Sequence, residues 1–276
     1  MTPFAHPRLG DHLCLPHDSD GERLGFSVAY VGSAMRTGRK VLVFTDALSP
    51  AAMRTELTRA IPRLAAAETS GQVEIYSSAE AHLAGGVFDA ARATRALTDA
   101  VRKARSSGWS GVCVLSDMGW AARDSPGAED LVAFEATINP LFAVGGLAAA
   151  CLYDRRLFTP ERIREACAAH PLTPGQAELR FISTPPGLIL FGEADLTNAP
   201  ALAGLLAPLT AGRDDVTLDA RELAFADLAA LRQLIALGDR TTGATTVLAG
   251  ASLSHLLRLL GAGEQPGFSV SEGEHA

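Results

Sequence analysis

Short apolar runs alternate with longer amphipathic stretches over the first 170 residues, and this alternation restricts the possible folds more than any other feature. The runs are bounded by glycine or polar residues, as buried strands are, and cover residues 12–16, 40–46, 73–78, 111–118 and 145–154. The stretches place apolar residues at helical spacing and cover residues 22–38, 49–61, 89–108, 128–144 and 159–170. Strand then helix, repeated, predicts an α/β fold whose mostly parallel sheet has helices on both faces.

A second, smaller pattern follows a segment rich in proline, glycine and polar residues near 172–180. Strands are predicted over 188–196, 215–220, 245–250 and 267–270, and helices over 199–209, 228–237 and 254–261. A chain of 276 residues is long enough for two hydrophobic cores. We therefore predict two domains, residues 1–175 and 176–276, of which the second is a small α/β domain.

The formal charge of −7 is unevenly distributed. Residues 1–175 carry 18 basic and 19 acidic side chains, whereas residues 176–276 carry 6 and 12. An acidic surface repels phosphate backbones, so we expect no nucleic-acid partner, and a basic protein partner is favoured. No apolar stretch approaches the roughly 20 residues that cross a bilayer, and the N-terminus lacks a signal-peptide pattern, so a cytoplasmic protein without membrane contact is predicted.

Three segments, residues 11–46, 116–139 and 151–171, carry landmarks in a characteristic order: a Met-x-Trp pair, a Phe-Glu helix, a Cys-x-Tyr-Asp strand end and a His-Pro terminator. Through them residues 10–172 resemble the MEDS sensory domain, the family of the dichloromethane-responsive regulator DcmR. That family is similar to the KaiC and RecA type of ATPase fold. The resemblance implies a RecA/KaiC-like sheet and a domain that senses small organic, hydrocarbon-like ligands.

Residues 180–262 resemble a STAS domain, the fold of bacterial anti-anti-sigma factors, through segments 187–202 and 216–234 with Asp195, Asp219 and Asp227 as polar landmarks. The resemblance implies regulation of transcription by partner switching, with an anti-sigma factor, often a serine kinase, as the partner. A homodimer is a further assembly that we consider. The partner-binding residues that it implies are Asp195, Phe225, Asp227, Leu228 and Ala229.

One position departs from the phosphorylated members of that family. They place Ser or Thr directly after the Asp that begins the second helix, whereas Leu228, Ala229 and Ala230 follow Asp227 here. A phosphate at that helix start would change partner docking. Control is therefore expected to come from the N-terminal domain, with a permanently active domain as the alternative.

The loop after the first predicted strand lacks the residues of a phosphate-binding loop. It holds Gly21 but no lysine, and it carries Asp18, Asp20 and Glu22, whose carboxylates would repel a triphosphate. No Gly-x-Ser-x-Gly, His-Glu-x-x-His or Gly-x-Gly-x-x-Gly motif occurs. We therefore predict a protein that is not an enzyme and has no cofactor, with a residual nucleotide-binding, ATPase-like protein as an alternative.

Ligands of open parallel sheets bind beyond the carboxyl ends of the strands. Met118, Trp120 and Tyr153 would supply an adaptable apolar wall there, although core packing is the more common role for each of them alone. Asp117 could instead cap a loop, and Glu135 could lie on a solvated helix face. The candidate ligand-binding residues are His17, Asp46, Asp117, Met118, Trp120, Glu135, Tyr153 and Asp154.

A metal- or thiol-based sensor is the other alternative. His12 and Cys14 would face the same way on one strand because strands repeat every two residues, and imidazole and thiolate are zinc ligands. A second closely spaced pair is missing, so no metal is assigned, and the cysteines are expected to be reduced core thiols. The candidate metal ligands are His12, Cys14, Cys151 and His170.

Overall fold

The computed structural model describes residues 6–210 and 215–273 and separates the chain into two compact units. The first unit is Met1–Phe134 with Gly146–Ala166, and the second is Glu135–Gly145 with Cys167–Ala276. Both units combine a sheet with helices, which confirms the α/β class. The domain boundary at residue 175 stays a prediction.

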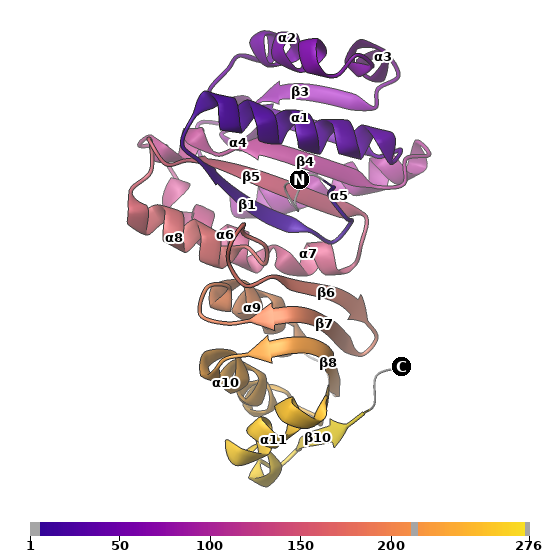
Figure 1. Cartoon of the computed structure of the whole chain (residues 1–276), viewed down its shortest axis with the longest axis vertical. Helices are drawn as coiled ribbons and strands as arrows, with labels where there is room; N and C mark the ends of the chain where they lie inside the picture. Colours follow the sequence, from indigo (N-terminus) through magenta and orange to yellow (C-terminus); the bar gives the residue numbers. More distant parts are fainter. Residues whose placement is uncertain (1–5, 211–214, 274–276) are drawn as a thin grey trace. The chain divides into compact units, whose positions relative to one another are not determined.

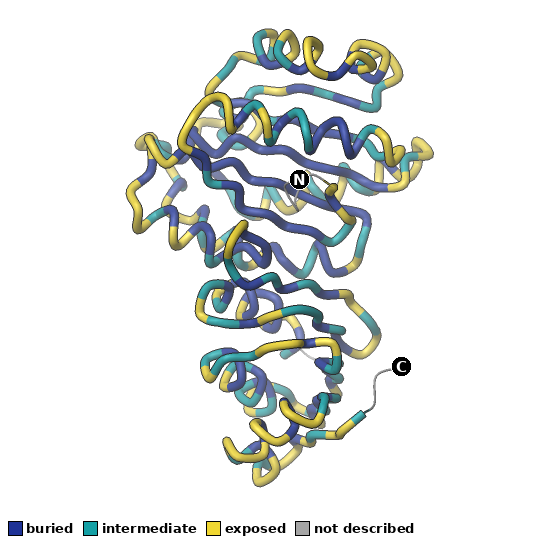
Figure 2. The backbone as a smooth tube through the Cα atoms, viewed as in Figure 1, coloured by how far each residue is buried: buried dark blue, intermediate teal, exposed yellow. Residues whose placement is uncertain are grey.

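The first unit is built on a parallel five-stranded sheet in the order β1-β5-β4-β2-β3 (Figure 1). Its strands fall where the apolar runs predict them: β1 His12–His17, β2 Lys40–Thr45, β3 Val73–Ser77, β4 Val112–Asp117 and β5 Leu147–Asp154. Every residue of β4 and β5 is buried, because strands with both faces covered can be apolar throughout. Figure 2 shows these strands as the buried centre of the unit.

Helices cover both faces of this sheet, as predicted. Figure 1 shows α1 (Asp20–Arg36) in front of the strands and α5 (Ala90–Ser106) behind them. The first turn of α1 is capped by Ser19, whose hydroxyl accepts from the Glu22 N–H, while the Glu22 carboxylate accepts from the Asp18 N–H. The other predicted helices in this unit correspond to α2 (Pro50–Ala60) and the main part of α8 (Pro160–Ala169).

Three local features differ from the prediction or were not predicted. The helix predicted over 128–144 is divided into α6 (Leu131–Thr137) and α7 (Asn139–Ala143), since Pro140 has no N–H and begins a new helix in the first turn of α7. The strand predicted over 73–78 stops at Ser77, which caps the short helix α4 (Ser78–His82). Another short helix, α3 (Leu64–Thr69), was missed because six residues are too few to show helical periodicity.

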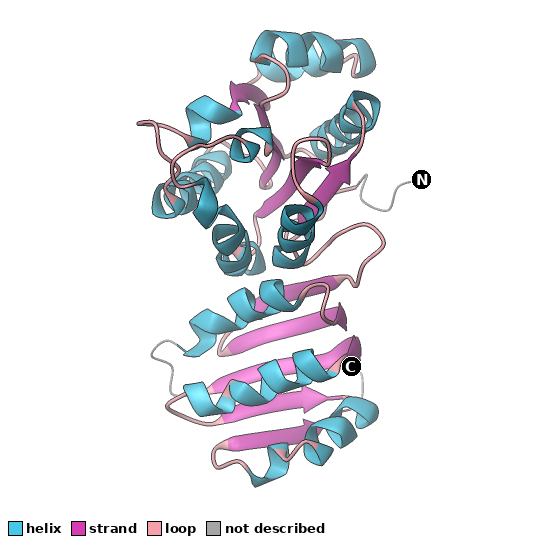
Figure 3. Ribbon diagram, turned by 90° about the vertical axis from the view of Figure 1, so that its left-hand side faces the viewer, coloured by secondary structure: helices cyan, strands magenta, loops and turns pink. Residues whose placement is uncertain are grey.

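The second unit has a five-stranded sheet in the order β10-β9-β8-β7-β6. The pair β6 (Leu179–Thr184) and β7 (Gly187–Ala194) is antiparallel, and the remaining neighbours are parallel: β8 Val216–Ala226, β9 Thr245–Ala249 and β10 Phe268–Glu272. Figure 3 shows its helices lying across one face of the sheet: α9 Ala199–Leu206, α10 Leu228–Ala236 and α11 Ala251–Leu259.

Strand β6 is the main addition to the predicted architecture. Its residues fall around the proline-rich segment that was interpreted as a linker, and Leu179 and Phe181 are buried while Ile182 is exposed. A strand with one buried face gives a short alternation rather than an apolar run, so its signal is weak. Strand β8 also continues to Ala226, beyond the predicted end at residue 220, and its pairing with β7 shifts register twice.

Within residues 6–210 and 215–273, none of the helices combines the length and apolar character needed to span a bilayer.

Candidate functional site

The carboxyl ends of β1, β5 and β4 bring three predicted ligand-binding residues to one edge of the first sheet. His17 pairs with Asp154 across β1 and β5, and Asp117 pairs with Leu152, two residues before Asp154. Side chains alternate along a strand, so His17, Asp117 and Asp154 share one face, and Tyr153 occupies the other. The predicted group is therefore divided between the two faces of the sheet.

Asp117 holds the loops at this edge together. Its carboxylate accepts from the N–H groups of Asp46 (3.3 Å), Ala47 (2.9 Å) and Gly119 (3.1 Å), and its carbonyl accepts from the Ser78 hydroxyl (2.9 Å). The structure thus supports the interpretation of Asp117 as a loop cap.

Asp46 lies beside Asp117 and receives two hydrogen bonds from the Arg123 guanidinium, at 2.9 and 2.5 Å. The hydrogen bonding of the Arg123 guanidinium to Asp46 raises the pKa of Arg123. Because the Asp46 side chain is largely buried, this pair fixes the segment after β4 to the segment after β2.

His17 and Asp154 form the other part of the edge. Burial lowers the pKa of the His17 imidazole, although the carboxylates of Asp154 and Asp117 act in the opposite direction. Asp154 accepts three hydrogen bonds from the Arg156 side chain at 2.6 to 3.1 Å, which lower its pKa. Arg156 also donates to Asp20 of α1 at 2.8 Å. At neutral pH this edge therefore holds a neutral imidazole beside ionised carboxylates.

The aromatic side chains predicted to form a ligand wall are packed in the core. Trp120 is 0% exposed and stacks on His82, with ring centroids 5.4 Å apart, and it packs against the tilted ring of Phe88 at 5.3 Å. Tyr153 and Met118 are also buried, and Tyr153 contacts Phe158 at 5.3 Å. This geometry matches the packing interpretation, and ligand binding by these side chains stays a prediction.

The remaining candidates are distributed over both units. In the first, His12 Nε2 lies 3.9 Å from Cys151 Sγ, and Cys14 is the register partner of Cys151. All four cysteines are buried thiols outside any disulfide. In the second, His170 Nε2 lies 3.6 Å from the Glu135 carboxylate. Glu135 is buried, so the interpretation that it lies on a solvated helix face was wrong.

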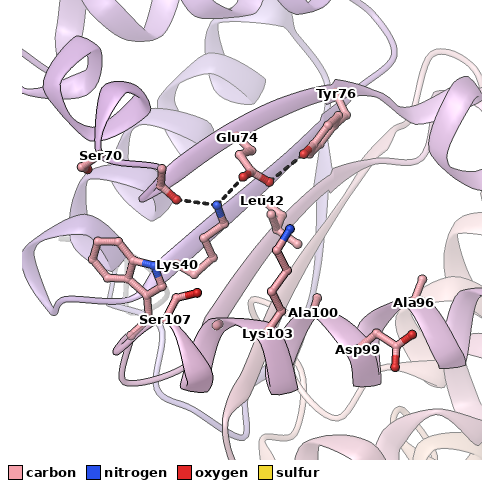
Figure 4. A pocket seen from close by; sticks show the side chains of 13 residues that line it. Lys40, Leu42, Ser70, Glu74, Tyr76, Ala96, Asp99, Ala100, Lys103 and Ser107 are labelled. Carbon is pink, nitrogen blue, oxygen red and sulfur yellow. Dashed lines mark hydrogen bonds and ion pairs between the residues drawn. The ribbon is translucent and has the colours of Figure 1, made fainter.

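Sequence reasoning missed a cavity of about 460 Å³ between β2, β3 and α5, a volume within the range of small-molecule sites. Figure 4 shows Lys40, Glu74 and Tyr76 linked along one wall and Lys103 rising from α5. Lys40 Nζ lies 2.6 Å from the Glu74 carboxylate, which accepts from the Tyr76 hydroxyl at 2.6 Å. That hydrogen bond raises the pKa of Tyr76 to about 12.

The cavity joins charged groups to apolar surface. Burial acts to raise the pKa of Glu74, but hydrogen bonds from Lys40 and Tyr76 hold it below its ordinary value. The residues that line the cavity come from separate stretches of the sequence, so no spacing pattern in the sequence could have revealed them. They are Lys40, Leu42, Ser70, Gly71, Glu74, Tyr76, Ala96, Asp99, Ala100, Lys103, Ala104, Ser107 and Trp109.

The predicted partner-binding residues lie around the carboxyl ends of β7 and β8. Glu193 pairs with Phe225, and the Asp227 N–H donates to the Ala194 carbonyl at 3.0 Å. Asp195 accepts from the Thr197 N–H (2.7 Å) and hydroxyl (2.5 Å), so it stabilises the turn that follows β7.

At the start of α10, which follows β8, an aspartate again has a structural role, and the neighbouring apolar side chains are exposed. Asp227 caps α10 by accepting from the Ala230 N–H at 2.8 Å. Phe225 and Leu228 are exposed and Ala229 is half-buried, so the apolar side chains, rather than the aspartates, are available for contact.

Comparison with known proteins bears on the first region. A family model described as MEDS, the methanogen/methylotroph DcmR sensory domain, matches residues 11–171. No curated protein matches the chain. The match agrees with the resemblance of residues 10–172, and it ends before the STAS-like region, whose assignment stays a prediction. Since the match covers more than half of the 276 residues, the chain belongs to the MEDS family of sensory domains.

Proposed function

We propose that this chain is a cytoplasmic regulator of transcription that acts by partner switching. The MEDS family supplies a sensory role for the first region. The second region is proposed to act as a STAS-like, anti-anti-sigma domain that binds an anti-sigma factor or a serine-kinase-type anti-sigma protein. The observation that carries the proposal is an exposed apolar patch where the resemblance expects the partner.

The patch consists of Leu196, Phe225 and Leu228, which are 74, 51 and 48% exposed. Phe225 and Leu228 bracket the junction of β8 and α10, and Leu196 follows the neighbouring end of β7. Large apolar side chains grouped on a surface mark interaction sites, and aromatic residues contribute most to such contacts. The excess of acidic side chains in residues 176–276 favours a partner with a basic surface.

The sensory ligand is proposed to be a small organic molecule that binds in the cavity beside Lys40. The aliphatic side chains of Leu42 and Ala100 and the rings of Tyr76 and Trp109 offer apolar surface, and the charged groups offer orientation. The core packing of Trp120 makes this cavity a better candidate than the edge near that residue.

A direct binding measurement tests the partner. The full chain is titrated into purified candidate anti-sigma kinases in a calorimeter, and we expect one of them to bind. Replacing Phe225 by Ser should weaken that binding by about tenfold or more, because an aromatic anchor at the centre of an interface is commonly worth over 1.4 kcal/mol. The matched control is Leu259→Ser, which alters a 69% exposed leucine on α11. Equal losses in both variants, or no binding by the native chain, would reject the proposal.

The second class of function is a metal- or thiol-based sensor, favoured by the 3.9 Å approach of His12 Nε2 to Cys151 Sγ. Elemental analysis of protein purified without a histidine tag separates it from the first. A stoichiometric transition metal that is lost in a Cys151→Ser variant would favour this class.

A further inference from the structure

Two buried polar side chains of the first unit lack hydrogen-bond partners. His17 is 1% and Arg23 is 4% exposed, and neither imidazole nitrogen, nor Nε or Nη1 of the guanidinium, has a hydrogen-bond partner. The carboxylate of Asp20 lies 3.8 Å from Arg23 Nε, too far for a hydrogen bond, and it is mostly exposed. Buried donors, above all charged ones, are nearly always paired in folded proteins.

Both side chains lie at the junction between strand β1 and helix α1. Arg23 lies in the first turns of the 17-residue helix α1, and His17 ends the adjoining strand β1. Arg156 links the surroundings of the two groups, because it donates to Asp154, the register partner of His17, and to Asp20, whose carboxylate lies 3.8 Å from Arg23 Nε. We propose that a small monocarboxylate binds between the Arg23 guanidinium and the His17 imidazole.

The chemistry of the donors favours a carboxylate. The guanidinium presents N–H groups in a planar fork that matches two carboxylate oxygens, and the imidazole supplies a further N–H. A carboxylate would thereby accept from the Arg23 guanidinium and from one imidazole nitrogen, and it would add to the charge compensation that Asp20 gives Arg23 at 3.8 Å.

The neighbouring charges restrict the ligand to a single negative charge. The carboxylates of Asp117 on β4 and Asp154 on β5 act on His17, and Asp20 lies in the first turn of α1. Arg156 is already paired with Asp154 and Asp20. Because Asp20 already forms a 3.8 Å ion pair with Arg23, a singly charged ligand meets less repulsion from these three carboxylates than a phosphate dianion would. The site thus excludes the triphosphate of an ATPase and still accepts an anion.

An ion pair at the surface provides a route to this site. Arg156 joins Asp154 at the end of β5 to Asp20 in the first turn of α1, and the Arg156–Asp20 contact is about half exposed or more on both sides. Exposed ion pairs contribute little to stability, so this contact can open at small cost. The site shares no residue with the cavity beside Lys40, so it goes beyond the proposed organic-ligand site.

Thermal unfolding of the full chain tests the proposal. Sodium formate, acetate and propionate are added at constant ionic strength against chloride, with acetamide as the uncharged analogue and inorganic phosphate as the multiply charged anion. A ligand bound only by the folded state raises the melting temperature in a saturable manner. We expect saturable stabilisation by at least one carboxylate and none by acetamide or phosphate.

Variants assign the effect to this site. Arg23→Gln should weaken carboxylate binding about tenfold or more, as expected when charge-assisted hydrogen bonds are lost. Arg36→Gln, on the exposed last turn of the same helix, should leave it unchanged. If circular dichroism shows that Arg23→Gln does not fold, the His17 ring resonances of the native chain, assigned with His17→Gln, must shift on carboxylate addition.

The proposal is overturned if no carboxylate stabilises the native chain, if phosphate or acetamide stabilises it equally, if folded Arg23→Gln binds as tightly as the native chain, or if the His17 resonances do not move. Phe225→Ser should keep carboxylate binding, so failure here is distinguishable from failure of partner switching.

Discussion

Burial decides what the two tryptophans do. Trp120 is fully enclosed by His82, Phe88 and the sheet, whereas Trp109 is only half-buried at the cavity beside Lys40. We expect Trp120→Ala to lower the free energy of unfolding by about 3–5 kcal/mol, because it leaves a cavity in a packed core. Trp109→Ala is the matched control and should cost less. Urea denaturation of both variants measures the difference, and equal costs would contradict the packing interpretation.

Asp154 should make folding stability sensitive to acid. Its hydrogen bonds from Arg156 lower its pKa below the ordinary value of 3.8. The unfolded state therefore binds a proton at higher pH than the folded state does. The stability contributed by Asp154 is complete above pH 3.8 and is lost as the pH falls through the lower, folded pKa.

The Asp154→Asn variant should consequently be less stable than the native chain at pH 6, and this difference should shrink as the pH falls below 3.8. Denaturant unfolding of both proteins at several pH values measures this. A difference that stays constant down to the acid-unfolding range would show that Asp154 and Arg156 do not stabilise the fold as an ion pair.

At the scale of single elements, the start of α10 separates a folding role from a binding role. Asp227 caps this helix through the Ala230 N–H, so Asp227→Ala should lower the free energy of unfolding by about 1 kcal/mol. Asp227→Ser should retain most of it because serine also caps. Denaturant titration of the variants tests the cap. Partner affinity that falls more in Asp227→Ser than in Phe225→Ser would place the contact on the aspartate instead of the apolar patch.

Elements with continuous apolar runs could be predicted, and half-buried or very short ones could not. Strands β4 and β5 are covered on both faces, so they are apolar up to the polar residues at their carboxyl ends, and the run was visible. Strand β6 has one buried face and lies in a segment with prolines, which resembled a linker. The break between α6 and α7 depends on Pro140, which the helical spacing of residues 128–144 concealed.

The candidate site was less predictable than the sheet, because it depends on which side chains meet in three dimensions. Strand ends placed His17, Asp117 and Asp154 at one edge correctly, since parallel strands end together. Because successive side chains of a strand point to opposite faces of the sheet, the sequence could also have shown that Tyr153 lies on the other face from these three residues. The stacking of Trp120 and the cavity beside Lys40 arise from residues far apart in the sequence, for which no local pattern exists.

At the scale of the whole molecule, the proposed regulation requires that ligand and partner influence each other. If an organic ligand in the cavity beside Lys40 changes the affinity for the anti-sigma partner by some factor, the partner must change the affinity for that ligand by the same factor. We expect a factor of about 5–150, the common range for coupled sites. The missing hydroxyl after Asp227 makes this coupling the proposed replacement for phosphorylation.

Two calorimetric titrations measure this coupling in the full chain: the partner with and without saturating ligand, and the ligand with and without saturating partner. Phe225→Ser should abolish the effect of the partner while ligand affinity stays unchanged, since Phe225 lies in the second unit and the cavity lies in the first. If both ligands bind and neither alters the other, the second region is permanently active and the MEDS domain does not control it. If the two factors differ, a third state or an additional ligand takes part, because equilibrium coupling between two sites is reciprocal.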